Sequence, residues 1–150
     1  MGVASPPVLR PIRESDVRSI ARWYDTAVVL AGSPIPLSGL LESTDGRGAL
    51  VVTESGGREP EGLIAVAADD PEPGWATVAL FAIAATEKRD LASQAVALLE
   101  AILSQHASHV RAAAPSDVGL ALYFWLRLGY RPAAFAGRLW MMRDFDTQGE

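Results

Sequence analysis

The sequence lacks cysteine entirely, which excludes disulfide bonds, thiolate metal sites and a cysteine nucleophile. Its only histidines are His106 and His109, too few for a multi-histidine metal centre. Lysine and arginine form no continuous stripe and the net charge is −5, so we expect no nucleic-acid partner. No apolar segment reaches the roughly 18 uncharged residues of a membrane helix, and residues 1–16 lack the pattern of a signal peptide. These absences predict a cytoplasmic protein with no metal and no membrane partner.

The composition is that of one globular domain. The chain has 150 residues, of which 49% are hydrophobic and 21% are charged, so it can bury a sizeable core. It contains no Gly-x-Ser-x-Gly, Walker or dinucleotide-binding fingerprint, and no internal repeat or linker. We therefore expect a single domain over residues 1–150, with its core within residues 8–145.

Residues 75–105 form the unit around which the other predicted elements are arranged. Ala76 to Ala85 is an almost unbroken apolar run, which predicts a strand buried on both faces. From Leu91 onward the apolar residues recur at helical spacing, and Thr86 is the expected N-cap of that helix. A buried strand that leads through a short polar turn into a helix places helix N–H groups at the carboxyl end of the strand. Anionic ligands often bind at such a position in α/β proteins.

The remaining elements follow from periodicity and turn residues. A helix opens at residues 13–16 and its apolar stripe runs to Val28, while residues 37–41 suggest a short second helix. Gly129 is expected to close the last helix in the left-handed conformation. Strands are predicted at 8–12, 49–53, 63–68, 75–85, 109–114, from 130 onward and at 138–145, and the two later helices at 91–103 and 118–128. The order is therefore β-α-α-β-β-β-α-β-α-β-β, a mixed α/β class in which three successive antiparallel strands form a meander.

This order resembles that of the GNAT superfamily of N-acetyltransferases. The segments LRPIRESDVRSIARWYD and LALYFWLRLGYRP are similar to the opening strand and helix of that family and to its fourth helix with the following turn. The resemblance implies the GNAT fold and transfer of an acyl group from acetyl-CoA to an amine of a small molecule or peptide.

The resemblance also implies that the coenzyme pyrophosphate lies at the turn of residues 85–92. The family pattern there is Arg or Gln, two residues, Gly, one residue, then Gly or Ala. Starting from Arg89, Ala92 and Gln94 occupy the glycine positions; starting from Lys88, Leu91 and Ser93 occupy them. Neither register contains glycine, and a solvated, mixed-charge helix start is the alternative interpretation. The implied coenzyme contacts are Phe81, Ile83, Lys88, Arg89, Asp90, Leu91, Ala92, Ser93, Gln94 and Trp125.

Few residues offer acid–base chemistry. The strand of residues 75–85 has no ionisable side chain, and Trp125 stands where many family members have the tyrosine that protonates the leaving thiolate. Tyr123 and Tyr24 remain possible participants, with Tyr123 as the catalytic candidate, although a tyrosine in an apolar helix more often belongs to the core. The frequent helix asparagine of the family corresponds to Val118. The predicted substrate pocket is lined by Trp23, Tyr24 and Ile35.

Acidic side chains gather in two predicted turns, for which a solvated rim and attraction of a cationic amine are both open interpretations. They are Glu54, Glu59, Glu61, Asp69, Asp70 and Glu72.

Two functions follow from these observations, and a third possibility is that the cleft binds a different small molecule. In the first, an amine attacks the thioester directly, while backbone N–H groups near Phe81 to Ile83 polarise its carbonyl. In the second, the chain is a non-catalytic GNAT-like module for binding or oligomerisation. Trp140, Met141 and Met142 either pair across a homodimer or face the core.

Overall fold

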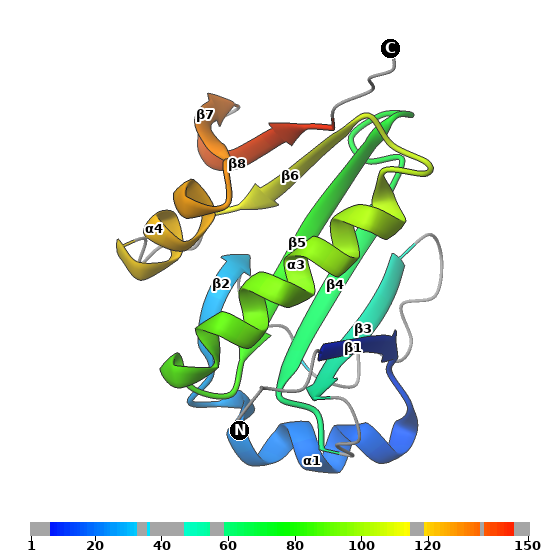
Figure 1. Ribbon diagram of the computed structural model, residues 1–150, viewed down its shortest axis with the longest axis vertical. Helices are drawn as coiled ribbons and strands as arrows, with labels where there is room; N and C mark the ends of the chain where they lie inside the picture. The colour runs from blue at the N-terminus through cyan, green and yellow to red at the C-terminus, as the bar shows by residue number, and fades with distance from the viewer. Residues whose placement is uncertain are drawn as a thin grey trace, which may run out of the picture.

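The computed structural model describes residues 7–32, 36, 47–54, 59–114, 119–135 and 137–145. They form a mixed α/β fold around an eight-stranded sheet in the order β1-β3-β4-β5-β6-β8-β7, with β2 attached to β5 (Figure 1). The elements are β1 (Pro7–Pro11), α1 (Glu14–Tyr24), β2 (Val28–Gly32), β3 (Arg47–Glu54), β4 (Gly62–Ala68), β5 (Trp75–Ile83), the 3₁₀ helix η1 (Thr86–Lys88), α3 (Arg89–Leu103), β6 (His109–Ala113), α4 (Gly119–Arg127), β7 (Arg131–Phe135) and β8 (Arg138–Asp144). The predicted fold class is confirmed.

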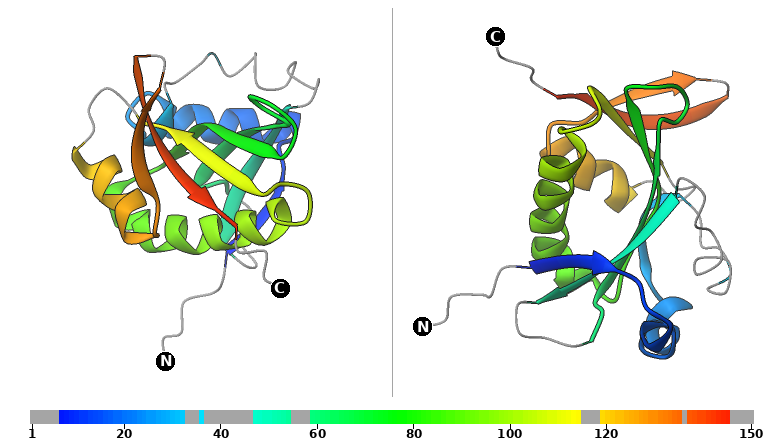
Figure 2. Two further views of the ribbon diagram at one scale, coloured as in Figure 1. Left: turned by 90° about the horizontal axis from the view of Figure 1, so that it is seen from above. Right: turned by 90° about the vertical axis from the view of Figure 1, so that its right-hand side faces the viewer.

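The sheet separates two hydrophobic clusters, with α1 on one face and α3 on the other (Figure 2). Strands β3, β4 and β5 form the predicted antiparallel meander, and β5 continues in parallel to β6. Because side chains alternate between the two faces of a strand, Val51 packs with Ile20 of α1, whereas Val52 packs on the side of α3.

A buried acidic residue begins α1. Asp16 is only 4% exposed, and its carboxylate accepts hydrogen bonds from the two terminal nitrogens of Arg10 at 2.7 and 2.8 Å and from the backbone N–H of Arg13 at 2.8 Å. The Arg10 guanidinium therefore holds the pKa of Asp16 below its usual value. This pair ties the first turn of α1 to β1.

The end of α4 is held against α3. Gly129 has φ +94°, as predicted for a left-handed closing residue. Tyr130 follows Gly129, and its hydroxyl donates to Glu100 Oε2 of α3 at 2.7 Å. Arg143 of β8 donates to the same carboxylate oxygen at 3.1 Å. Burial raises the pKa of Tyr130, and the charge of Glu100 raises it further. Tyr130 is therefore a fixed structural donor.

The chain departs from the predicted elements near the end of α1. The helix ends at Tyr24, and residues Val28–Gly32 form β2, whereas the apolar stripe had predicted a helix to Val28. Residues Val28–Gly32 form a strand because they pair with β5. Local periodicity does not predict this long-range contact. The predicted helix at residues 37–41 lies outside the described residues.

Three smaller predictions are also settled. The strand predicted to reach Ala85 ends at Ile83, and α3 begins at Arg89 with Lys88 as its N-cap, so Thr86 does not cap it. A turn of 3₁₀ helix at residues 86–88 accounts for the shift. Trp140 and Met141 are buried in the chain's own core, at 8% and 0% exposure, which excludes them from a dimer surface.

Candidate functional site

The site predicted beside Ile83 lies where β5 and β6 separate. The two strands pair only from Trp75 to Val78 of β5, opposite His109 to Ala112 of β6. Beyond that point the same edge of β5 pairs in antiparallel fashion with β2, because β4 occupies the other edge along its length. Strand β2 thus lies in the gap that opens between the two parallel strands (Figure 1).

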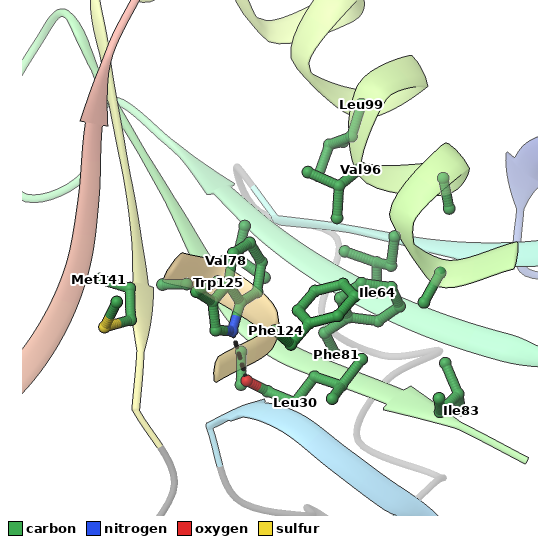
Figure 3. Close-up of a cluster of buried hydrophobic side chains, with 14 of the residues drawn as sticks. Leu30, Ile64, Val78, Phe81, Ile83, Val96, Leu99, Phe124, Trp125 and Met141 are labelled. Atoms are coloured by element: carbon green, nitrogen blue, oxygen red, sulfur yellow. Dashed lines mark hydrogen bonds between the residues drawn. The ribbon is translucent and has the colours of Figure 1, made fainter. Parts of the chain in front are cut away.

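Close contacts hold β2 in this gap. Gly32 has φ +72°, and a Cβ atom there would stand 1.8 Å from the carbonyl oxygen of Ala79, the residue at the register shift of β5. The Trp125 indole N–H of α4 donates to the carbonyl of Leu30 at 2.6 Å (Figure 3). Leu30 and Ala31 are both 0% exposed. The sequence therefore contains specific residues that let β2 approach β5 and keep it there.

This arrangement determines the surroundings of Phe81 and Ile83, the two residues predicted to lie near the thioester. Phe81 is opposite Ala31 in the β2 register, and Ile83 is opposite Val28. Both side chains are buried in the cluster beneath α3, at 1% and 2% exposure. An extended ligand that paired with this edge of β5 would have to take the place of β2.

Lys88 forms ion pairs with carboxylates from the end of β3 and from the turn that precedes β4. Lys88 Nζ lies 2.9 Å from Glu61 Oε1 and 3.9 Å from Glu54 Oε2. The contact with Glu61 raises the pKa of Lys88, and the two carboxylates together outweigh its single positive charge. A phosphate bound through Lys88 would have to compete with both.

A cavity of about 430 Å³ lies between the first turns of α3 and the body of α4. It is lined by Glu87, Arg89, Asp90, Ser93, Tyr123, Phe124, Arg127 and Leu128. The guanidinium of Arg127 stands 5.7 Å from the centre of the Tyr123 ring, and Tyr123 is 56% exposed, so this tyrosine does not belong to the core. The cavity combines two arginines and the N-terminus of the fifteen-residue helix α3, which favour an anion, with the carboxylates of Glu87 and Asp90, which oppose one.

The structure brings some of the predicted coenzyme contacts together and separates others. Arg89, Asp90, Ser93 and Tyr123 share the cavity. Leu91, Ala92 and Trp125 are buried in the core, and Gln94 is exposed outside the cavity lining. Arg127, which sequence reasoning missed, stands four residues after Tyr123, and that helical spacing was the available signal.

The predicted substrate pocket is only partly described. Trp23 is half-buried, and its indole N–H donates to the carbonyl of Pro60 at 3.1 Å. Trp23 and Tyr24 both pack against the cluster around Ile20 on the α1 face. Ile35 and Val118 lie outside the described residues.

Other kinds of site are not found in the part of the chain that the structure describes. No group of three or more acidic or histidine side chains there could hold a metal ion. None of the described helices has the length and apolar character needed to span a bilayer.

Comparison with known proteins identifies solved structures with the same fold. No family model and no curated protein matches the sequence. Among solved structures, an acetyltransferase from Thermus thermophilus is similar at a TM-score of 0.72 and 20% identity, over 95% of this chain and 99% of that one. The ribosomal-protein-S18-alanine N-acetyltransferase of Escherichia coli is similar at 0.70 and 11%, over 96% and 97%. A spermidine N-acetyltransferase variant from Vibrio cholerae is similar at 0.62 and 15%, over 92% and 93%. The chain therefore has the fold of these acetyltransferases, as the order of its elements predicted.

Proposed function

We propose that this GNAT-fold chain is an acyl-CoA-dependent N-acyltransferase that moves an acetyl group from acetyl-CoA to an amine of a small molecule or peptide. The observation that carries the proposal is the cavity at the start of α3, whose lining includes Arg89, Ser93 and Arg127 beside a helix N-terminus. Guanidinium groups and free helix N–H groups are the donors that phosphates prefer. The solved acetyltransferases named above share the fold, which supports the same assignment.

The chemistry would be direct attack of the amine on the thioester, which forms a C–N bond and releases the thiolate. Positioning of the two reactants supplies much of the acceleration in such transfers. Tyr123 is the one described tyrosine in the cavity and is our candidate for returning a proton to the thiolate. No described residue of β5 is ionisable, so solvent or the acceptor itself would take the ammonium proton.

A second candidate function is a GNAT-like binding module without catalytic activity. The pairing of β2 with residues 80–83 of β5 favours it, because a thioester-bearing arm has no free strand edge there. The engagement of Lys88 by Glu61 and Glu54 favours it as well. A module of this kind would hold a phosphate-bearing ligand at the cavity and leave the region beside β5 closed.

Titration calorimetry with acetyl-CoA tests the proposal. We expect saturable binding, and we expect R127Q to weaken it by about tenfold or more, as for loss of one charge-assisted hydrogen bond. Arg18→Gln, at an exposed position of α1, is the control and should leave binding unchanged. No heat at high micromolar acetyl-CoA would reject the assignment.

Turnover separates the two candidates. Release of coenzyme thiol in the presence of a panel of primary amines supports the acyltransferase. Binding without any thiol release above the uncatalysed rate supports the module.

A further inference from the structure

A second cavity, of about 290 Å³, lies on the face of the sheet opposite α3. It is lined by Pro71, Glu72, Trp75, Arg111, Trp140 and Met142, and it shares no residue with the cavity between α3 and α4. The registers place Thr77, Arg111 and Met142 side by side across β5, β6 and β8. Because their neighbours Val78, Val110 and Met141 pack toward α3, these side chains point to the other face.

The walls of this second cavity are mainly aromatic and apolar. The ring of Trp75 stacks on His109 with a centroid separation of 4.6 Å, which fixes one wall. Trp140 is 8% exposed and forms another wall, and Met142 is half-buried between strands β6 and β7. Water near such walls has few partners, so burial of an apolar ligand here is favourable.

Arg111 is the polar group of the cavity, and it is held rigidly. Its side chain is 12% exposed, and its Cζ atom lies 3.7 Å from the centre of the Trp140 ring. Its Nε–H donates to Thr77 Oγ1 at 2.9 Å, and that hydroxyl in turn donates to the carbonyl of Asp70 at 2.7 Å. The orientation of the guanidinium plane is thus set before any ligand binds.

The terminal nitrogens of Arg111 donate no hydrogen bond to a described residue. The nearest acidic atom, Asp70 Oδ2, lies 3.8 Å from Nη2, which is an ion pair but too long for a hydrogen bond. Asp70 is itself 43% exposed, so solvent weakens the pairing. A planar fork of donors in an apolar cavity matches one chemical group best, a carboxylate bound through two parallel hydrogen bonds.

We infer that this second cavity binds a small monocarboxylate with an aromatic or branched apolar body. The carboxylate pairs with Arg111, and the body lies against Trp75 and Met142. Glu72 at the exposed rim disfavours a second negative charge on the ligand. This site lies apart from the one in the proposed function, so it stands or falls independently of acyl transfer.

Phenylacetate is a suitable probe, because two of the four tryptophans line the cavity and report on its occupancy. We expect saturable quenching of tryptophan fluorescence with a Kd of about 1 mM, in keeping with a ligand of this size. The neutral 2-phenylethanol and the cationic phenethylamine should bind at least tenfold more weakly. Equal binding of either one, or no saturation by phenylacetate up to about 20 mM, would overturn the inference.

Two arginine variants make the test specific to the cavity. Arg111→Lys keeps the charge but removes the planar fork, and it should weaken phenylacetate binding about tenfold. Arg138 also lies over the Trp140 ring, at 5.3 Å, yet it does not line the cavity, so R138K is the matched control and should bind as the parent does. If R111K does not fold, Met142→Trp, which fills the cavity and leaves Arg111 in place, should abolish binding instead. Equal affinities for R111K and R138K, or unchanged affinity in M142W, would refute the carboxylate site.

Discussion

Replacing Gly32 with alanine tests whether β2 is built to lie against β5. The new Cβ would stand 1.8 Å from the carbonyl oxygen of Ala79 and 2.9 Å from its carbonyl carbon. Both are backbone atoms of a strand that is paired on two sides, so they cannot move aside cheaply. The substitution also places an L side chain at φ +72°. We therefore expect β2 to be pushed away from the edge of β5.

The two costs can be estimated separately. The left-handed backbone conformation costs a non-glycine residue about 1–2 kcal/mol. Overpacking against a rigid neighbour adds about 1–3 kcal/mol. The free energy of unfolding should therefore fall by about 2–5 kcal/mol, which a domain of this size can tolerate while staying folded.

Gly137→Ala is the matched control, because Gly137 has φ +74° and nothing within 4 Å of the added Cβ. G137A therefore has the conformational cost without the steric clash. Urea unfolding of both variants isolates the contact with Ala79, and equal losses of stability would refute the close approach. Hydrogen exchange of the amides of residues 80–83 should accelerate in G32A and stay unchanged in G137A. If β2 excludes acetyl-CoA from the β5 edge, G32A should bind acetyl-CoA more tightly than the parent does.

Two further substitutions probe contacts that join elements far apart in the chain or hold β2 in place. Asp16→Asn removes the ion pair with Arg10 and should lower the free energy of unfolding by about 2–3 kcal/mol in urea at pH 7. Because the folded state lowers the pKa of Asp16, its contribution is present above the unfolded value of about 3.9 and is lost as the pH falls below it. The variant should accordingly lose less stability than the parent between pH 5 and about pH 2, and parallel curves would contradict this assignment. Trp125→Phe leaves the Leu30 carbonyl without its donor, so the free energy of unfolding should fall by about 1–3 kcal/mol and amide exchange in β2 should be faster. An unchanged unfolding midpoint in urea would show that this hydrogen bond contributes nothing to stability.

Local patterns were sufficient for most of the fold. Apolar runs separated by turn residues predicted the meander, β6 and the two last strands. Helical periods predicted α3 and α4, each of which buries one face against the sheet. Strand β2 was not predictable in this way. Val28 stands four residues after Tyr24 and extends the helical stripe, so the sequence near α1 is compatible with either structure. The choice is made by pairing with Ile83, more than fifty residues away, which no local window contains.

Family resemblance predicted an anion site at the start of α3. The structure has a cavity lined by Arg89 and Ser93 at that place, and anion binding there stays a prediction. The orientation of the Lys88 side chain depends on its ion pair with Glu61. From the sequence alone, the turn that contains Glu61 could be described only as acidic. This ion pair joins η1 to the turn before β4 through the tertiary fold, so neither local sequence predicts it by itself.

Trp125 links the two features that bear most on activity. At this position the resemblance implies the tyrosine that protonates the leaving thiolate, and an indole has no useful acidity. In the structure the same indole N–H donates to the carbonyl of Leu30 and helps to keep β2 beside β5. Trp125 therefore stands at the position of the implied acid and also contributes one of the contacts that hold β2 beside β5. A tyrosine there carries its donor at the tip of the ring and not at the position of the indole nitrogen, so we expect the contact with Leu30 to weaken while a phenolic acid is introduced. W125Y is accordingly expected to loosen β2 and to strengthen acetyl-CoA binding together, and a variant that did one without the other would show that the two features are separable.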